Sequence, residues 1–131
     1  PDGVCDLVVA AQAAHWFDME AFNAEARRVT KAGGVVALVT YGIMTGGPAV
    51  DAVVAPFYHG TVGPFWPPER RHVETGYRDL PFPFAPLAAP PLAITVAWTL
   101  DDLAGYVDTW SATKAYAKAR GDDPVAALRE G

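Results

Sequence analysis

The chain has 131 residues, of which 51% are hydrophobic and 19% are charged, and its formal net charge is −5. This composition is typical of a globular chain and excludes an intrinsically disordered one. The acidic balance, with no basic cluster larger than Arg27-Arg28 and Arg70-Arg71, argues against a nucleic-acid partner, and the lack of any apolar run of roughly 18 residues argues against a membrane partner.

A strand, a helix and a second strand are predicted first along the chain. The strands are Cys5–Ala11 and Val35–Tyr41, two short, valine-rich apolar runs of the kind found in parallel sheets that are covered on both faces. The segment between them carries one apolar stripe at helical spacing, formed by Met19, Phe22, Ala26 and Val29. Asp18 is expected to cap this helix and Gly33 to end it, which predicts an α/β fold.

Ligands of parallel sheets bind beyond the carboxyl ends of the strands. This rule places Gln12–Asp18 and Gly42–Gly46 at the functional rim of the predicted sheet. A buried parallel strand also needs neighbours on both sides, and the sequence opens at Pro1 without a methionine. We therefore expect the chain to be a fragment of a larger domain, and, without a signal peptide, a cytoplasmic one.

Residues 42–91 differ in composition from the sheet region. Nine of the twelve prolines lie between Pro56 and Pro91, interleaved with aromatic residues. A short helix is expected over Asp51–Gly60, and an irregular segment over Pro64–Phe84, because proline blocks both helices and central strands. A loop of this length in a compact domain is typical of a lid, so residues 42–91 are predicted to cover the rim.

The C-terminal part is predicted to contain a strand and two helices. Leu92–Trp98 alternates large and small residues, as strands do. Thr99 and Asp102 form a capping-box pattern that begins a helix running to about Arg120, and Asp123-Pro124 begins a shorter one.

The sequence contains no strong catalytic or metal-binding motif. The three histidines are scattered and Cys5 is the single cysteine, so no metal site is predicted. His15 is the candidate catalytic residue, as a general base or a hydrogen-bonding group in a pocket. The alternative, a histidine that caps the nearby helix or packs below the lid, is favoured by residue chemistry alone. Trp16 is similarly either a ligand contact or a core anchor.

Candidate substrate-binding residues lie at the end of the second strand and in the aromatic segment. Tyr41 closes the second predicted strand. Arg70 and Arg78 are able to hold a substrate carboxylate by bidentate hydrogen bonds, with solvated surface arginines as the alternative. Trp66 and Tyr77 either form the wall of an apolar pocket or fasten the loop.

The run from Asp6 to Leu38 resembles the second half of the class I S-adenosylmethionine-dependent methyltransferase fold. The resemblance rests on the pattern E-x-x-R-V-x-K-x-G-G, which is formed here by Glu25, Arg28, Val29, Lys31, Gly33 and Gly34. The segments His15–Asp18, Phe65–Arg71, Gly76–Phe84 and Thr109–Ala112 resemble the subgroup akin to trans-aconitate methyltransferase.

The resemblance implies a partial Rossmann-like methyltransferase sheet with a helical, proline-rich lid, and S-adenosylmethionine as cofactor. It implies methyl transfer to a small-molecule substrate, with a carboxylate as one candidate. The cofactor-binding residues that it implies are Ala10, Ala11, Gln12, His15 and Trp16. The family's glycine-rich loop and ribose-binding acidic residue are expected before Pro1, and its last antiparallel strand after Gly131. The alternatives are a non-catalytic small-ligand-binding module and an α/β module that forms homo-oligomers through open sheet edges.

Overall fold

The computed structural model of the protein describes residues 1–130. They fall into two compact units, each with its own core. The first, here called the sheet unit, comprises Pro1–Gly42 and Glu69–Pro90. The second, here called the helical unit, comprises residues 43–68 and 91–130. The predicted lid is thus divided, because its first part packs in the helical unit and its second part in the sheet unit.

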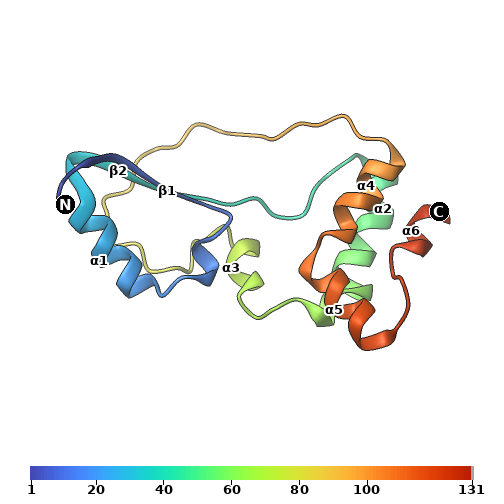
Figure 1. The fold of residues 1–131 in the computed structure, drawn as a ribbon. Helices are drawn as coiled ribbons and strands as arrows, with labels where there is room; N and C mark the ends of the chain where they lie inside the picture. Colours follow the sequence, from blue (N-terminus) through green and yellow to red (C-terminus); the bar gives the residue numbers. More distant parts are fainter. Residues whose placement is uncertain (131) are drawn as a thin grey trace. The chain divides into compact units, whose positions relative to one another are not determined.

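The sheet unit contains a parallel pair of strands joined by a helix, as predicted (Figure 1). Its elements are β1 (Cys5–Ala11), the short 3-10 helix η1 (Ala14–Trp16), α1 (Met19–Val29), β2 (Thr30–Val39) and α3 (Arg70–Glu74). Asp18 caps α1 by accepting hydrogen bonds from the backbone N–H groups of Glu20 and Ala21, both at 3.1 Å. The capping prediction for Asp18 is confirmed.

Within the described residues of the sheet unit, one face of the two-stranded sheet is covered. Ala10 is 5% exposed and lies in a cluster with Met19 of α1, against which the neighbouring Leu38 packs. On the other face Leu7 is 57% exposed and Val9 is 52% exposed. The expectation of a sheet covered on both faces is therefore wrong for the described residues, because they supply a single crossover helix, which covers one face.

The second strand begins earlier than predicted. α1 ends at Val29 and β2 begins at Thr30, so Gly33 lies inside a strand and does not end the helix. Gly33 has a φ of +79°, in the left-handed region, where the pairing register shifts between Cys5 and Leu7. A Cβ on Gly34 would lie 2.6 Å from Thr30 Cγ2 and 3.1 Å from the Asp6 carbonyl oxygen. The Gly33-Gly34 pair therefore permits an irregularity and a close approach between the strands.

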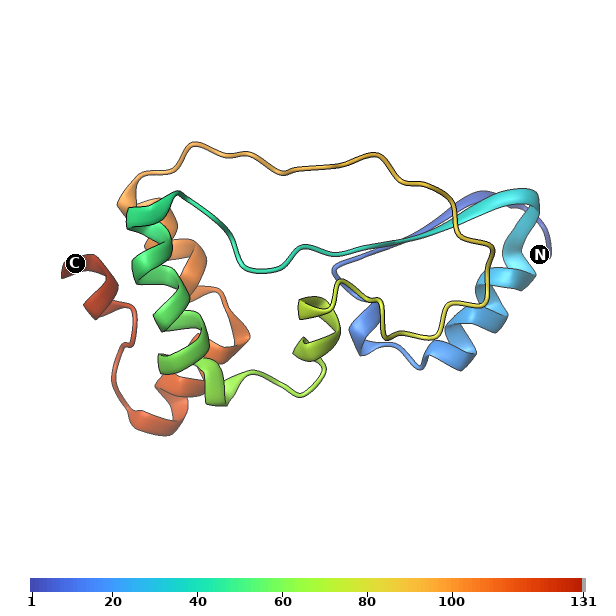
Figure 2. The same cartoon turned by 180° about the vertical axis from the view of Figure 1, so that it is seen from behind.

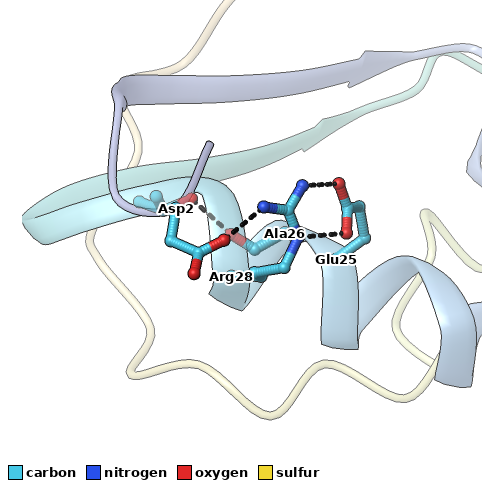
Figure 3. Close-up of polar contacts among 5 residues, drawn as sticks. Asp2, Glu25, Ala26 and Arg28 are labelled. Carbon is cyan, nitrogen blue, oxygen red and sulfur yellow. Dashed lines mark hydrogen bonds and ion pairs between the residues drawn. The ribbon is translucent and has the colours of Figure 1, made fainter.

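The charged residues of the E-x-x-R-V-x-K pattern form ion pairs at the start of the sheet unit. Arg28 Nη2 and Nε donate to the two carboxylate oxygens of Glu25 at 2.5 and 2.8 Å, and Arg28 Nη1 donates to Asp2 Oδ1 at 2.5 Å (Figure 3). Lys31 Nζ donates to the Asp6 carboxylate at 2.9 Å. These pairs are solvent-exposed, so their contribution to stability is small. They join the N-terminal segment to α1 and β2.

The helical unit consists of short helices (Figure 2), which pack around a mostly aliphatic buried cluster with partly buried aromatic residues against it. Its elements are α2 (Pro48–Pro56), the π-helical turn η2 (Phe57–Thr61), the 3-10 helix η3 (Gly63–Phe65), α4 (Leu100–Asp108), α5 (Ser111–Arg120) and α6 (Ala126–Glu130). The buried cluster comprises Phe57, Val62, Ala104, Val107, Ala112, Val125 and Leu128. The helix predicted over Asp51–Gly60 corresponds to α2 and η2, and the helix predicted after Asp123 corresponds to α6.

The helix predicted to run to about Arg120 is two helices. The predicted capping box is present, because the Thr99 side chain accepts from the Asp102 N–H while the Asp102 carboxylate accepts from the Thr99 N–H. The chain then breaks at Trp110, whose extended backbone (φ −63°, ψ 138°) separates α4 from α5. The Trp110 ring lies 5.5 Å from Tyr58 and 5.7 Å from Trp66, centroid to centroid. Placing this ring among its aromatic neighbours accounts for the break.

The strand predicted at Leu92–Trp98 is absent from the described residues. This segment has no regular secondary structure, and Leu92 and Ile94 are 82% and 78% exposed. A strand requires a neighbour that accepts its backbone hydrogen bonds, and none is provided here. No helix in residues 1–130 has the length and apolar character needed to span a membrane.

Candidate functional site

The carboxyl ends of β1 and β2 are joined by Gln12. Its backbone N–H donates to the Val39 carbonyl at 2.7 Å, and its φ of +51° turns the chain out of β1. Its side-chain Nε2 donates to the Tyr41 carbonyl at 2.9 Å, and its Oε1 accepts from Thr40 Oγ1 at 2.7 Å. The Gln12 side chain therefore has a structural role, because it connects the end of β1 to the residues that follow β2.

His15 lies directly after this turn, in η1, and faces Tyr77 from a distant part of the sequence. The His15 Nδ1 atom and the Tyr77 hydroxyl share a hydrogen bond of 2.8 Å. The ring of His15 is also 4.8 Å from that of Trp16, which is 58% exposed. The imidazole is thus held by a tyrosine on one side and flanked by an accessible indole.

The surroundings of His15 favour the neutral imidazole. Burial lowers its pKa from the ordinary value of 6.5, and the positive charges of Arg70 and, when protonated, His72 lower it further. Glu69 acts in the opposite direction and is the smallest of these influences. His15 is therefore uncharged near neutral pH and able to accept or donate one hydrogen bond at its second nitrogen.

A second polar cluster lies in and after α3. His72 Nδ1 and Asp79 Oδ2 are 2.8 Å apart, and Thr75 Oγ1 donates to Asp79 Oδ1 at 2.5 Å. The hydrogen bond from Thr75, followed by that from His72, lowers the pKa of the Asp79 carboxyl. None of these three residues is predicted as a site residue from the sequence, because the proline-rich pattern indicates an irregular segment where α3 forms. A helical interpretation of Arg70–Glu74 would have placed His72 and Thr75 one turn apart.

The structure places most of the predicted site residues in the sheet unit. These are Ala10, Ala11, Gln12, His15, Trp16, Tyr41, Arg70, Tyr77 and Arg78. His15, Arg70 and Tyr77 are brought together, although 55 residues or more separate the first from the other two. Ala10 is buried, whereas Tyr41 is 47% exposed, and Arg78 is exposed.

Two predicted substrate-binding residues have structural contacts. Trp66 lies in the helical unit, where its Nε1 donates to the Tyr58 carbonyl at 3.2 Å and its ring is 4.9 Å from that of Tyr58. Tyr77 is 7% exposed and belongs to the buried cluster of the sheet unit. Among residues 1–130, no group of three histidine, cysteine, aspartate or glutamate residues is arranged to hold a metal ion.

Comparison with known proteins relates the chain to methyltransferases. Residues 1–38 match a family model described as a methyltransferase domain. A candidate methyltransferase of Dictyostelium discoideum is 30% identical over 133 residues, which cover 99% of this chain and 51% of the relative. The solved structure of a candidate type II methyltransferase from Anaeromyxobacter dehalogenans is 52% identical, covers 98% of this chain and 55% of that chain, and superposes with a TM-score of 0.89.

The chain therefore spans about half the length of the relatives that it matches. The structural similarity, together with the parallel strands and crossover helix, confirms the predicted fold class, a partial Rossmann-like α/β sheet.

Proposed function

We propose that this chain is the latter part of a class I S-adenosylmethionine-dependent methyltransferase that acts on a small-molecule carboxylate. The observation that carries the proposal is the parallel β1–β2 pair whose carboxyl end presents His15 and Trp16, within a segment that matches a methyltransferase domain. Ligands of such sheets bind at this end of the strands. The lengths of the two relatives support the view that the remaining part of the domain lies in further sequence.

The residues at the end of β1 fit part of a cofactor site. Ala11 is exposed and has a small side chain, so a ligand is able to approach the backbone there. The exposed indole of Trp16 offers a flat apolar surface to an aromatic base. The side chains of Ala10 and Gln12 are turned to structural contacts, so these two residues would contribute backbone groups or support. When bound, S-adenosylmethionine supplies the electrophilic methyl group.

The chemistry near His15 fits an anionic acceptor. Arg70 lies close enough to lower the pKa of His15, and its guanidinium is suited to holding a carboxylate. Arg78 follows Tyr77 directly and is exposed, so we propose it as a second contact to the acceptor, with Tyr41 of the same unit as a candidate contact to its apolar part. Methyl transfer mainly requires alignment of the nucleophile with the methyl group, so no covalent intermediate on the protein is needed. The finer assignment that we propose is the trans-aconitate methyltransferase-like subgroup.

The cofactor proposal is tested by isothermal titration of the full-length protein that carries these residues with S-adenosylhomocysteine. We expect saturable binding that is weakened by Trp16→Ala. Trp98→Ala is the matched control, because Trp98 is an indole in the helical unit that contacts Tyr106 at 4.9 Å. An absence of heat above background for the wild-type protein would contradict the proposal.

The acceptor proposal is tested with a panel of di- and tricarboxylic acids and the corresponding alcohols and amines. We expect S-adenosylhomocysteine release and a methyl ester, identified by mass spectrometry, with the carboxylic acids alone. Arg70→Gln should raise KM for these acids more than it lowers kcat, because the arginine contributes to binding in the ground state as well as in the transition state. Methylation of the amines or alcohols in preference to the acids would assign a different acceptor class.

A second candidate function is that of a self-associating α/β module without catalysis. The observation that favours it is the uncovered apolar face of β1 and β2, with Leu7, Val9 and Val39 between 42% and 57% exposed. Open edges and apolar faces of sheets invite pairing between copies. Sedimentation of the 131-residue chain tests the second candidate, because a concentration-independent monomer is incompatible with it, and S-adenosylhomocysteine binding by the full-length protein would favour the first candidate.

A further inference from the structure

We propose that Tyr77 is a positioning residue that holds neutral His15 in the tautomer with its proton on Nε2, so that His15 acts as a hydrogen-bond donor and not as a general base. The tautomer assignment rests on the geometry of the sheet unit alone. Its consequence for the acceptor rests on the proposed methyl transfer.

Tyr77 is buried in the core of the sheet unit. The residue is 7% exposed and packs in the cluster that also contains Ala10, Ala14 and Val73. A tyrosine in this environment is held in place by packing, so the position of its hydroxyl oxygen is set by the fold. The hydroxyl reaches His15 Nδ1 at 2.8 Å.

The backbone at Tyr77 forms a turn with an unfavourable conformation. Gly76 and Tyr77 both have left-handed φ values, +63° and +61°. Glycine adopts this region freely, but tyrosine does so at a cost, and such residues persist where the surrounding structure holds them. The Tyr77 N–H donates to the His72 carbonyl at 2.8 Å, and the Tyr77 carbonyl accepts from the Leu80 N–H at 3.1 Å. The turn is therefore fixed on both sides of the unfavourable residue.

The side-chain cluster described above reinforces the same turn. The Thr75 hydroxyl shares its single hydrogen between the His72 carbonyl and Asp79, and Asp79 also contacts the His72 ring. These contacts connect the residues before Tyr77 with those after it. Tyr77 is thus held by two sets of hydrogen bonds, neither of which involves its own hydroxyl.

The hydrogen bond between Tyr77 and His15 has one donor, which is either the Tyr77 hydroxyl or His15 Nδ1. In the described residues the Tyr77 hydroxyl has His15 as its partner and no other acceptor. If His15 Nδ1 carried the proton and donated it, the hydroxyl hydrogen of Tyr77 would be left without a protein acceptor, which is unfavourable for a buried group. Donation from the Tyr77 hydroxyl to an unprotonated Nδ1 satisfies both groups. Neutral imidazole then carries its single proton on Nε2.

This assignment changes the chemistry available to the site. A protonated Nε2 donates a hydrogen bond and has no lone pair with which to remove a proton. An acceptor that depends on His15 must therefore bring an oxygen that is already anionic. A carboxylate meets this requirement at neutral pH, whereas an alcohol does not.

The tautomer is measured directly by long-range nitrogen–proton correlation NMR on the full-length protein labelled with 15N-histidine, at a pH above 7 and without cofactor. His15 is assigned with His15→Gln. We expect a pyrrole-type Nε2 and a pyridine-type Nδ1. The reverse pattern, with Nδ1 protonated, would overturn the inference whatever the behaviour of any variant.

Tyr77→Phe tests whether the tyrosine is the cause. This variant keeps the buried ring and removes the hydroxyl, so we expect the His15 signals to shift toward an average of the two tautomers. Tyr116→Phe is the matched control, because it removes a hydroxyl that contacts Asp122 in the helical unit, and it should leave the His15 pattern unchanged. Unchanged His15 signals in folded Tyr77→Phe would show that the hydroxyl does not select the tautomer.

The kinetic consequence is separable from the tautomer. With a carboxylate acceptor, the pH profile of kcat should show no loss of rate as His15 becomes protonated, since the imidazolium also donates from Nε2. A profile that falls in step with the His15 titration measured by NMR would restore the general-base role and contradict our inference. If the protein transfers no methyl group to any acceptor, the proposed function fails while the NMR result still decides the tautomer.

Discussion

His15 combines two influences that keep its ring uncharged and oriented. Partial burial and the nearby cation Arg70 disfavour the imidazolium, and Tyr77 occupies its Nδ1 atom. The interpretation of His15 as a packing residue and its interpretation as a ligand contact are therefore compatible. It packs against a buried tyrosine and also lies at the carboxyl end of β1, where a ligand is expected.

Replacement of His15 should reduce turnover more than stability. We expect His15→Ala to lower kcat/KM by about 10- to 100-fold, equivalent to about 1.4–2.8 kcal/mol of lost transition-state binding, because one hydrogen bond to the acceptor is removed. The free energy of unfolding should fall by about 1 kcal/mol, the worth of a single hydrogen bond. His59→Gln is the control, because His59 is exposed in the helical unit. Equal losses of rate and stability would assign His15 to packing alone.

The lowered pKa of His15 also predicts a dependence of stability on pH. The unfolded chain binds a proton at His15 near the ordinary value of 6.5, and the folded chain binds it only at lower pH. The stabilisation is therefore complete above pH 6.5 and is lost as the pH falls through the folded-state pKa. Urea denaturation of the wild-type protein and of His15→Gln should show a difference in unfolding free energy that shifts against the wild type on acidification. A pH-independent difference would contradict the assigned direction of the shift.

The strands and helices show how local sequence patterns become contacts. Gly34 lies where a side chain would collide with Thr30 and the β1 backbone, so the glycine pair of the methyltransferase-like pattern has a packing explanation. In the helical unit, a continuous helical pattern is interrupted at Trp110, where the indole packs against the rings of Phe57 and Tyr58 in η2 and of Trp66. Both features depend on how the elements pack against one another, and not on the helix or strand propensity of the residues in each element.

Gly34→Ala should destabilise the β1–β2 pair. We expect a loss of about 1–3 kcal/mol, the usual cost of adding a methyl group to a site without space. Gly105→Ala is the matched control, since this glycine lies in α4 with no atom within 4 Å of a built Cβ. Alanine there should leave stability unchanged or raise it by up to about 1 kcal/mol. Chemical denaturation measures both, and similar results for the two variants would contradict the close approach at Gly34.

Trp110→Ala should destabilise the helical unit by about 3 kcal/mol, toward the lower end of the range for buried aromatic residues because the ring is only partly buried. The ring contacts Phe57, Tyr58, Trp66 and Tyr106. Thermal unfolding followed by near-ultraviolet circular dichroism reports the loss. A change within about 0.5 kcal/mol would place the α4–α5 break outside the core.

At the level of the whole chain, the main feature is a pair of folded units with separate cores and an uncovered sheet face in one of them. The chain spans about half of each relative. We propose that residues outside this sequence cover the face formed by Leu7 and Val9, and that copies of the isolated chain associate through it.

This proposal predicts a contrast between the isolated chain and the full-length protein. Val9→Thr, which preserves the branched side chain, should shift the isolated 131-residue chain toward the monomer in sedimentation velocity. Val53→Thr is the control, because Val53 is 38% exposed in α2 of the helical unit. In the full-length protein Val9→Thr should instead lower stability by about 1–2 kcal/mol, since a polar group would then be buried. A monomeric isolated wild-type chain would contradict the association.

Much of the fold follows from short-range patterns in the sequence. The valine-rich runs, the apolar stripe from Met19 to Val29, and the caps at Asp18 and Thr99 each depend on neighbours a few residues away, and each appears in the structure. The strand predicted at Leu92–Trp98 does not form, because strand formation depends on a partner that a local pattern cannot supply. For the candidate site, the sequence indicated His15, Arg70 and Tyr77 separately but did not indicate their proximity.

Most helices and strands, their caps and the candidate site residues can thus be predicted from the sequence, because they depend on residue propensity and on spacing along the chain. The pairing of Tyr77 with His15, the turn of unfavourable φ that presents Tyr77, and the exposure of one sheet face arise from contacts between residues far apart in sequence. These contacts require the folded coordinates, because loop closure and side-chain packing, not local preference, choose which distant residues meet.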